Sequence, residues 1–538
     1  MKINIKGQLL LLTLTGCIVS CDSNTNNSAA NHPQNQPALV EIEQNTGRWI
    51  YGDMHIHSTA SDGHNLITTV LDRGFNDFGS SFLINTDHSG FNAYKLNDSL
   101  FRITRTDEEI INLKDDIEPH SHDYAKQVYP NDKALTERSK IINTQYTHIE
   151  KYRDTLLKGQ YLFQGMEWTI PYTNEHATLL ILDNGEQEAL IDFHNRYAKG
   201  NAFDNEKTLE YSLQAVIELD NNFNDQAFYI FNHPSRKHKV TIEDIRHFHN
   251  AAPHTFIGME GAPGHQRDVQ ARGKYAQNAP ITLTDYNDYG IAYHGRTYGG
   301  FDYMTARLGG VWDALLSEGR QFSILSSSDF HSLYNDFWPN EYAKTYYFLE
   351  EESAAGIISA IKSGNSFVVH GDLISSLDFN ASTSGMTATM GEQLNITKNQ
   401  EITVTINTTI PAFNHHKDAP DLAFIDVIAG TTSTLKNIHD SDFNKPFADN
   451  TYIIKSFTKG DNHWINNNGE IALSFTFTAP ETGMYLRLRG SNHPKGTPGF
   501  VDKQGNPIVD TAKTGFTNTE EMAWSDLWFY SNPIYLTQ

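Results

Sequence analysis

Short apolar runs alternate with stretches of helical periodicity between residues 48 and 367. The apolar runs fall at residues 82–84, 179–182, 227–231, 256–257 and 322–325. Strands that alternate with helices in this way are typical of α/β folds built on a parallel sheet. Four of the runs end in or near polar residues, at 85–88, 232–234, 260 and 328–331. Because the functional residues of α/β barrels sit where strands end, we expect chemistry at these positions.

After residue 371 the pattern changes to alternation. Residues 401–406 and 471–477 alternate apolar and polar side chains strictly, and residues 484–488 do so less cleanly. Such alternation is typical of half-buried strands, and several in series favour a β-sandwich. We therefore expect two domains, an α/β domain over residues 46–373 and an all-β, sandwich-like domain over residues 374–538.

Residues 89–162 form an insertion without strand character in the first domain. Apolar side chains recur there at roughly helical spacing, at Leu135, Ile142, Tyr146, Ile149, Tyr152 and Leu156. This spacing predicts an amphipathic helix. The helix either packs against the rest of the domain, which we favour, or covers the functional site.

The first 21 residues have the pattern of an export signal. Lys2 and Lys6 precede a short apolar run over residues 9–19, too short to span a bilayer comfortably. Cys17 and Cys21 each end a segment that resembles a bacterial lipoprotein box. We favour Cys21 because it leaves the longer apolar run, and an ordinary secretory signal is the alternative. Residues 22–45, rich in Asn, Ser and Gln, predict a flexible linker.

These features predict an exported lipoprotein that faces the periplasm or cell surface and touches the membrane only through its lipid anchor. The chain has 65 acidic and 41 basic residues, a formal net charge of −24. Such a surface repels bulk nucleic acid, so we expect a small-molecule substrate, and an anionic one would need metals or arginines to attract it. Both cysteines lie in the export signal. Metal ligands in the folded part must therefore be His, Asp, Glu or backbone groups.

The most specific motif is GDMHIHSTASDG over residues 52–63. His55 and His57 are two apart in an expected strand, and the two-residue period of a strand turns both rings to the same side. Both imidazoles can therefore reach one cation. Asp62 follows in a Ser-Asp-Gly turn.

Together with four later segments, this motif resembles the polymerase and histidinol phosphatase (PHP) domain. The later segments are Thr86-Asp87-His88, Gly165-Met166-Glu167 with His176, Asn232-His233-Pro234 and Ser328-Asp329-Phe330-His331. They occur in the family's order, and the resemblance covers residues 48–372. Segments at 425–428, 487–490 and 530–535 further resemble the CehA/McbA-type branch, a group named for a carbamate-hydrolysing enzyme.

The resemblance implies a distorted (β/α)7 barrel that holds two or three divalent metal ions. The first metal would be held by His55, His57, Glu167 and Asp329. The second would be held by Glu167, His176 and His233, with Glu167 bridging, and the third by Asp62, His88 and His331. Family members often have His where Asp62 stands. Imidazole and carboxylate ligands without thiolates suit Zn, Mn or Fe.

Such a centre predicts a hydrolase. Two metals about 3.5–4 Å apart can hold a bridging water and lower its pKa toward about 7, which makes hydroxide the expected nucleophile. Glu167 and Asp329 would take part in catalysis through the metals they hold. Arg236 either clamps a phosphate oxygen with its planar guanidinium or is a solvated surface charge, and the sequence leaves both open.

Two further side chains have less certain roles. His265, five residues after the strand end at Glu260, lines the pocket, donates a proton to the leaving group or, as a third reading, stabilises a turn. Asp87 is expected to orient the region around His88 rather than bind a metal.

We expect hydrolysis of a phosphomonoester or phosphodiester. The alternative, with the same metal centre, is a carbamate, ester or amide hydrolase, and comparison of aryl phosphates with aryl carbamates separates the two. A hypothesis of another class is a non-enzymatic surface module that binds a ligand through its β-domain. That hypothesis predicts that residues 374–538 bind the ligand alone and that His55→Ala leaves function intact.

Overall fold

A computed structural model describes residues 47–58, 61, 63, 65–88, 149, 152–153, 157, 159–182, 186–198, 208–236, 240–267, 272, 297–333, 336–510, 513, 515–516 and 518–538. The expected export signal, the linker, nearly all of the insertion and Asp62 lie outside these residues. Residues Thr46–Gln538 form one compact unit. In the described part of the chain, no helix is long and apolar enough to cross a bilayer.

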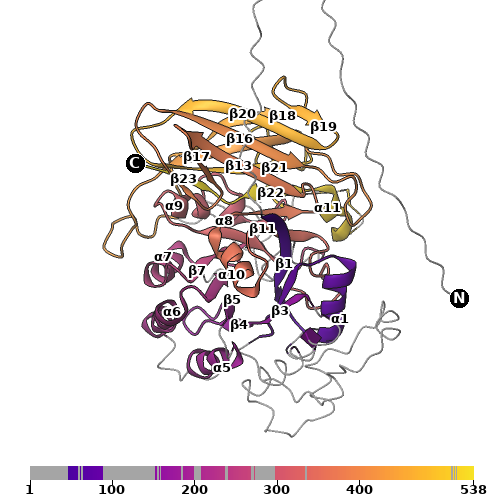
Figure 1. Cartoon of the computed structure of the whole chain (residues 1–538), viewed down its shortest axis with the longest axis vertical. Helices are drawn as coiled ribbons and strands as arrows, with labels where there is room; N and C mark the ends of the chain where they lie inside the picture. The colour runs from indigo at the N-terminus through magenta and orange to yellow at the C-terminus, as the bar shows by residue number, and fades with distance from the viewer. Residues whose placement is uncertain are drawn as a thin grey trace, which may run out of the picture. The chain divides into compact units, whose positions relative to one another are not determined.

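A five-stranded sheet lies beside most of the long helices (Figure 1). Its order is β10 (Ser323–Ser326), β7 (Phe256–Ala262), β6 (Ala227–Phe231), β5 (His176–Ile181) and β4 (Met166–Thr169). Strands β6, β7 and β10 are parallel, whereas β4 and β5 are antiparallel to their neighbours. Only residues 170–175 separate β4 from β5, a length that permits a hairpin but no parallel crossover.

Helices α5 (Glu186–Tyr197), α6 (Leu209–Phe223) and α7 (Ile242–Ala251) lie along one side of this sheet (Figure 1). Their apolar faces share a hydrophobic core with the sheet, which includes Trp168, Leu179, Phe193, Val216, Leu219, Tyr229, Ile245 and Phe248. Thr241 and Asp244 form a capping box at the start of α7, which satisfies backbone N–H groups that the helix leaves without partners.

An eleven-stranded sheet contains strands from both ends of the unit. Its main path is β15 (Gln393–Asn395), β23 (Ile534–Thr537), β21 (Met484–Ser491), β22 (Trp528–Ser531), β12 (Ser366–His370), β11 (Ala343–Leu349), β1 (Arg48–Ile56), β2 (Phe82–Asn85) and β3 (Tyr161–Gln164). Strand β17 (Phe424–Thr431) pairs with β21 and with β18 (Thr451–Thr458). Strands β1, β2 and β3 are parallel to one another.

A second five-stranded sheet is antiparallel throughout. Its order is β14 (Met386–Thr389), β13 (Ser376–Thr383), β16 (Glu401–Thr409), β20 (Glu470–Thr478) and β19 (Ile465–Asn467). Inward residues of β13 and β16 share one hydrophobic cluster with β17, β21 and β22, including Phe379, Val404, Ile406, Ile425, Val427, Leu486, Leu488 and Phe529. The alternation along residues 401–406 therefore marks one face buried against the eleven-stranded sheet.

The remaining elements connect these sheets. Helix α10 (Ala354–Ser363) begins at the cap residue Ser353 and ends at Gly364, whose φ of 72° suits glycine. Its isoleucines share a cluster with apolar residues of the eleven-stranded sheet and of the five-stranded sheet that contains β5, β6 and β10. The shorter elements are α1 (Ile67–Asp72), η1 (Arg73–Asp77), β8 (Thr297–Tyr298), β9 (Phe301–Asp302), α8 (Tyr303–Ala306), α9 (Val311–Leu316) and α11 (Thr519–Ser525).

The expectation of a mixed α/β fold is confirmed, with a finer arrangement than the pattern of apolar runs indicated. The sheets are open, and the described strands do not close into a barrel. Strand β12, before the expected boundary near Ile374, pairs with β22 near the C-terminus, with Phe367 opposite Ser531. One sheet thus crosses the expected boundary, and the division into two domains stays a prediction.

A buried ion pair joins α9 to the C-terminal strand β21. The Arg487 guanidinium donates to both carboxylate oxygens of Asp313, at 2.7 and 2.8 Å, and Tyr485 Oη donates to the same carboxylate at 3.0 Å. The side chains of Asp313 and Arg487 are at most 1% exposed. Loss of one partner would leave the other charge buried without compensation.

We expect Asp313→Ala to lower the free energy of unfolding by about 3–5 kcal/mol, because Arg487 would keep its buried charge. Urea unfolding followed by circular dichroism measures this change. The matched control is Glu352→Ala, which removes the exposed partner of Arg48 and should cost less than about 1 kcal/mol. Equal effects of the two substitutions would contradict the proposed importance of the buried pair.

Candidate metal centre

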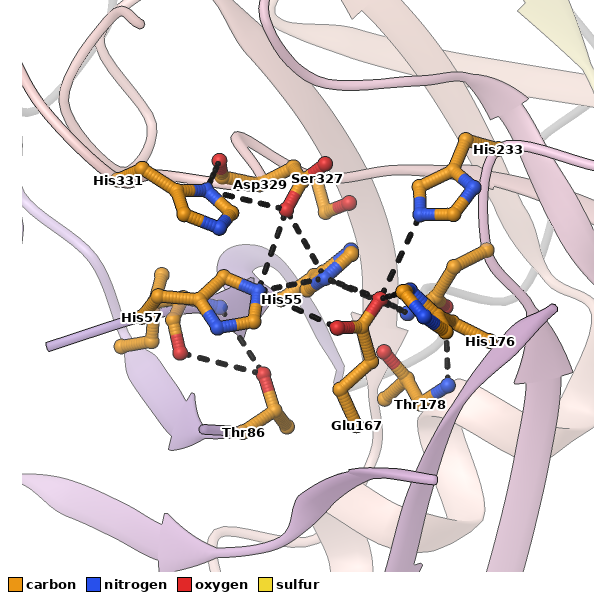
Figure 2. Close-up of polar contacts among 12 residues, drawn as sticks. His55, His57, Thr86, Glu167, His176, Thr178, His233, Ser327, Asp329 and His331 are labelled. Carbon is orange, nitrogen blue, oxygen red and sulfur yellow. Dashed lines mark hydrogen bonds and ion pairs between the residues drawn. The ribbon is translucent and has the colours of Figure 1, made fainter. Parts of the chain in front are cut away.

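The ends of several strands bring histidines and carboxylates into one buried group (Figure 2). His55 lies near the end of β1, and His57 directly follows that strand. Glu167 lies in β4, and His176 begins β5. The other three follow strands: His88 comes after β2, His233 after β6 and the segment 329–331 after β10. Two isolated parallel bridges, Ile56 with Phe330 and His88 with Glu167, connect the eleven-stranded sheet at this place with the five-stranded sheet that contains β4 and β10.

Glu167 is the carboxylate around which most of the imidazoles gather. Its Oε1 lies 3.0 Å from His55 Nε2, 2.9 Å from His176 Nδ1 and 3.5 Å from His233 Nε2. Its Oε2 lies 2.5 Å from His88 Nδ1 and 3.6 Å from His57 Nε2. The predicted bridging position of Glu167 is compatible with this arrangement, because Oε1 faces three rings and Oε2 faces two others.

Asp329 occupies the opposite side of the group. Its Oδ1 lies 3.0 Å from His55 Nε2 and 3.2 Å from His57 Nε2. Its Oδ2 lies 2.9 Å from His265 Nε2 and 3.3 Å from Arg236 Nη1. One oxygen therefore faces the expected ligands, and the other faces the two side chains that were predicted to contact substrate.

The donor atoms of this group fit divalent cations. Among the residues that the structure describes, four sets of three have ligand atoms within 4.8 Å of one another: His57, His88 and His331; His55, His57 and Asp329; His88, Glu167 and His176; and His265, Asp329 and His331. Within the described part of the chain, Nδ1 of His233 has no hydrogen-bond partner and Nε2 has only the 3.5 Å contact with Glu167, although the residue is only 1% exposed. Buried polar atoms without partners are rare, and a cation would satisfy this one.

A close contact between two imidazole nitrogens also supports a cation in this group. The Nε2 atoms of His55 and His57 lie 3.0 Å apart. Without a cation, that contact requires one nitrogen to carry a proton and the other to accept it. With a cation, both lone pairs point at the metal, as they do where two histidines share a tetrahedral site. These buried groups can hold metal ions.

The electrostatic balance of the group depends on its histidines. Burial alone would raise the pKa of Glu167, but His176, His88 and His55 hold it well below the usual range. Burial alone would lower the pKa of His55, but Asp329, Glu167 and Glu260 raise it well above the usual value. Protons on the imidazoles thus compensate the carboxylates. Metal ions would replace those protons, so metal affinity should fall as pH decreases.

His57 and His265 differ in their surroundings. Burial, followed by the charges of His331 and His88, lowers the pKa of His57 to about 3, which favours the neutral ring that a metal requires. Burial opposes protonation of His265, but Asp329 and Asp336 on its two sides raise its pKa to about 10. The two carboxylates therefore favour the protonated ring of His265.

A second layer of carboxylates fixes the rings. His55 Nδ1 lies 2.7 Å from Glu260 Oε1, and Glu260 Oε2 accepts the backbone N–H of His233 at 2.7 Å. Ser327 Oγ also donates to Glu260. Asp53 accepts the backbone N–H groups of His55 and Ser328, at 3.0 and 2.9 Å. Carboxylates behind metal-binding histidines set the tautomer and orientation of the ring.

Asp87 holds the turn after β1 rather than facing the ligand atoms. It accepts the backbone N–H and the hydroxyl of Ser58, both at 2.8 Å, and the Ser61 hydroxyl at 2.5 Å. These bonds support the turn after β1, so the expected role of Asp87 in orienting the region around His88 stays a prediction. The Thr86 hydroxyl accepts the Ile56 N–H at 3.0 Å, which adds a further connection between the β1 and β2 ends.

Three residues of the site have left-handed backbone conformations, with φ of 30° at His233, 59° at His265 and 47° at Asp329. Such conformations are unfavourable for residues other than glycine, and they cluster at functional sites where the surrounding fold enforces them. Gly264 has a related role. A Cβ at position 264 would lie 2.2 Å from Asp329 Cβ, so only glycine lets the His265 loop approach the Asp329 turn.

The structure brings together every predicted ligand except Asp62, which lies outside the described residues. It also places the predicted substrate-contacting residues, Arg236 and His265, beside Asp329. The sequence reasoning assigned no role to Asp53, Glu260 or Asp336. Asp53 carried a usable signal, because it is two residues before His55 on the same strand face, and Glu260 ends an apolar run. Asp336 follows no strand and carried none.

Comparisons of the chain with models of protein families, with curated proteins and with solved structures gave no match. The assignment of a class therefore depends on the geometry of the site and on the resemblance of the motifs.

We expect Glu260→Gln to weaken metal binding by about 10–100-fold, because the ring of His55 would lose the carboxylate behind it. Glu167→Gln should weaken metal binding further than Glu260→Gln does, since it removes a ligand from the middle of the group. Metal content after dialysis, measured by plasma mass spectrometry, and competition with a chelator give the affinities. Glu341→Gln, a substitution outside the group, should retain wild-type affinity, and a Glu260→Gln protein with full affinity would refute the supporting role.

Proposed function

We propose that this protein is a metal-dependent hydrolase of the PHP type that cleaves phosphoesters. The observation that carries the proposal is the buried convergence of His55, His57, His88, His176 and His233 on Glu167, with Asp329 opposite. A purely structural role would not require so many imidazoles around one buried carboxylate, since buried charges stabilise folds poorly.

The donor set suits two or three ions of Mn, Zn or Fe, because it offers imidazole and carboxylate without thiolate. Such ions would supply Lewis acidity, which activates water and neutralises the negative charge that develops on the attacked group. The chain's own residues hold the ligands in place, keep the site dry and provide the side chains that contact the substrate.

Arg236 supports a phosphoester substrate. Its guanidinium lies 3.3 Å from Asp329 Oδ2, at the edge of the expected metal positions, and its side chain is 20% exposed. A cation that is partly accessible beside a metal centre can bind a non-bridging phosphate oxygen in a bidentate manner. In a protein with a net charge of −24, such a local positive group would also help to attract an anion.

The wider architecture is also proposed to follow the PHP pattern. The bridges between Ile56 and Phe330 and between His88 and Glu167 connect the eleven-stranded sheet at the site with the five-stranded sheet that contains β4 and β10. A distorted barrel that is incompletely closed would have this arrangement. With the predicted export signal and lipid anchor, we propose that the enzyme acts on small anionic substrates outside the cytoplasm.

The first test is hydrolysis of bis(p-nitrophenyl) phosphate and p-nitrophenyl phosphate by signal-free protein loaded with Mn, Zn or Fe. We expect metal-dependent turnover that His55→Ala reduces to background, because His55 contacts both Glu167 and Asp329. Turnover of aryl carbamates alone would favour the carbonyl hydrolase instead. Metal-loaded protein that hydrolyses neither class would refute the proposal.

Arg236→Ala should distinguish phosphate binding from a surface charge. We expect kcat/KM for the phosphoester to fall by about 10–100-fold, the loss typical of a hydrogen bond to a charged group. Any activity on a neutral aryl carbamate should change little, since that substrate offers no anionic oxygen. Arg48→Ala, which removes an exposed arginine paired with Glu352, is the control. Equal losses on both substrates would show that Arg236 acts through Asp329 instead.

A further inference from the structure

His265 lies between two carboxylates, one on each ring nitrogen. Nε2 is 2.9 Å from Asp329 Oδ2, and Nδ1 is 2.5 Å from Asp336 Oδ1. The two carboxylates differ in their other contacts. Asp329 faces His55 and His57 with its second oxygen, so it belongs to the group that holds metal. Among the described residues, the hydrogen bonds of the Asp336 carboxylate reach that group only through the His265 ring and the backbone at His331 and Ser332.

Asp336 is fully buried and fixes two parts of the site at once. Its Oδ2 accepts the backbone N–H groups of His331 and Ser332, at 2.5 and 2.9 Å, while Oδ1 accepts from the His265 ring. Its own N–H donates to Ser332 O at 3.0 Å. This one carboxylate therefore connects the loop after β10 with the loop after β7.

The His265 loop is held from its other side by residues of the C-terminal region. Arg272 Nη1 donates to Gln266 Oε1 at 3.1 Å, and Arg272 Nη2 donates to Asp526 Oδ2 at 3.3 Å. Arg267 Nε donates to Glu520 Oε2, in α11, at 3.0 Å. The side chains that follow His265 are thus tied to the C-terminal region, while the His265 N–H donates to Ser328 O at 3.3 Å, so the segment that carries the ring is held on two sides.

The contacts favour a proton donor over an additional metal ligand at position 265. A carboxylate behind a histidine is compatible with either role, because both need a fixed ring. However, Arg236 Nη1 lies 3.3 Å from Asp329 Oδ2, the same oxygen that His265 faces. A metal ion bound there would stand beside a guanidinium in a buried site, where repulsion between like charges is strong.

We propose that Asp336 is a positioning residue that aims His265 at the leaving group of the substrate, an inference that depends on the proposed function. As the oxygen of a water molecule bonds to phosphorus and releases a proton to solvent, the bond between phosphorus and the leaving oxygen breaks. The electron pair of that bond stays on the leaving oxygen, which takes the proton from His265 Nε2. Nδ1–H stays bonded to Asp336 throughout, and solvent returns the proton to Nε2 after the product leaves. The substrate class this implies is a phosphoester whose leaving group is a basic alkoxide or phenolate that requires protonation.

The experiment compares metal-loaded wild type, Asp336→Asn and His265→Gln on two diesters. Nitrophenolate departs from bis(p-nitrophenyl) phosphate without a proton, whereas the more basic phenolate of diphenyl phosphate benefits from one. In Asp336→Asn, the amide oxygen can still accept from the backbone N–H groups of His331 and Ser332. Its NH2 group then faces His265 Nδ1, where a proton acceptor is needed.

The matched control is Asp220→Asn. Asp220 Oδ1 also accepts two consecutive backbone N–H groups, those of His254 and Thr255, at 3.0 and 2.8 Å. It contacts no ring of the site and lies by the start of β7, whereas Glu260 lies near the end of that strand. The substitution therefore makes the same chemical change at a carboxylate that accepts backbone N–H groups, at a place away from His265.

We expect both site variants to keep wild-type metal content and to lose about 10²-fold in kcat on diphenyl phosphate. On bis(p-nitrophenyl) phosphate they should lose less than about tenfold, and Asp220→Asn should show no such difference between substrates. Equal losses on the two diesters would overturn the proton-donor role. Loss of bound metal in His265→Gln would overturn it too and would make His265 a ligand.

A readout without turnover separates this inference from the proposed function. A low-field imidazole N–H resonance in proton NMR should be present in the wild type and absent from His265→Gln and Asp336→Asn. If the wild type hydrolyses no phosphoester but shows this resonance, the proposed substrate is wrong and the positioning contact stands. If the resonance persists in Asp336→Asn, Asp336 does not hold the His265 ring, whatever the activity of the variant. The NMR result therefore decides whether Asp336 holds the ring even if the variant is too unstable for kinetics.

Discussion

The compensation of one buried carboxylate by imidazoles is the interaction on which the rest of the site depends. Glu167 has five histidine rings within 3.6 Å of its two oxygens, and none of these side chains is more than 8% exposed. An ionised carboxylate at such depth is costly unless charges or hydrogen bonds compensate it. Protons on the rings can do so, and divalent cations can do so better because each accepts several lone pairs. The site is therefore built for a positive occupant.

Much of this site was predictable because strand geometry is regular. The two-residue period of β1 places His55 and His57 on one side, and the polar ends of β2, β6 and β10 supplied His88, His233 and Asp329. The antiparallel turn of β4 and β5 was not visible in the apolar runs, although it explains why His176 stands at the start of its strand, before the apolar run at 179–182. Antiparallel pairing with β4 places the start of β5 beside Glu167, with Thr169 opposite His176.

Other features depend on tertiary contacts that no local pattern records. Asp336 follows a segment without apolar periodicity. One of its partners, His265, is 71 residues away in the sequence, and the other, His331, is 5 residues away. Similarly, the alternation after residue 371 predicted the strands correctly but not their partners. Strand β22 pairs with β12, so a strand counted with the first domain and one counted with the second are neighbours.

That shared sheet gives the C-terminal region a role beyond that of an attached module. Buried charges from it reach the loop that carries His265: Asp510, Lys513 and Asp526 surround Arg272, whose other nitrogen binds Gln266. Groups of buried ion pairs add little net stability, but they specify geometry, since any other arrangement leaves a charge without compensation. A rigid loop is what a proton donor needs, because misplacement by about 1 Å can cost about 10²-fold in rate. The C-terminal strands and the site thus belong to one unit, in which buried charges of the C-terminal region hold the segment that carries His265 beside the group of histidines and carboxylates.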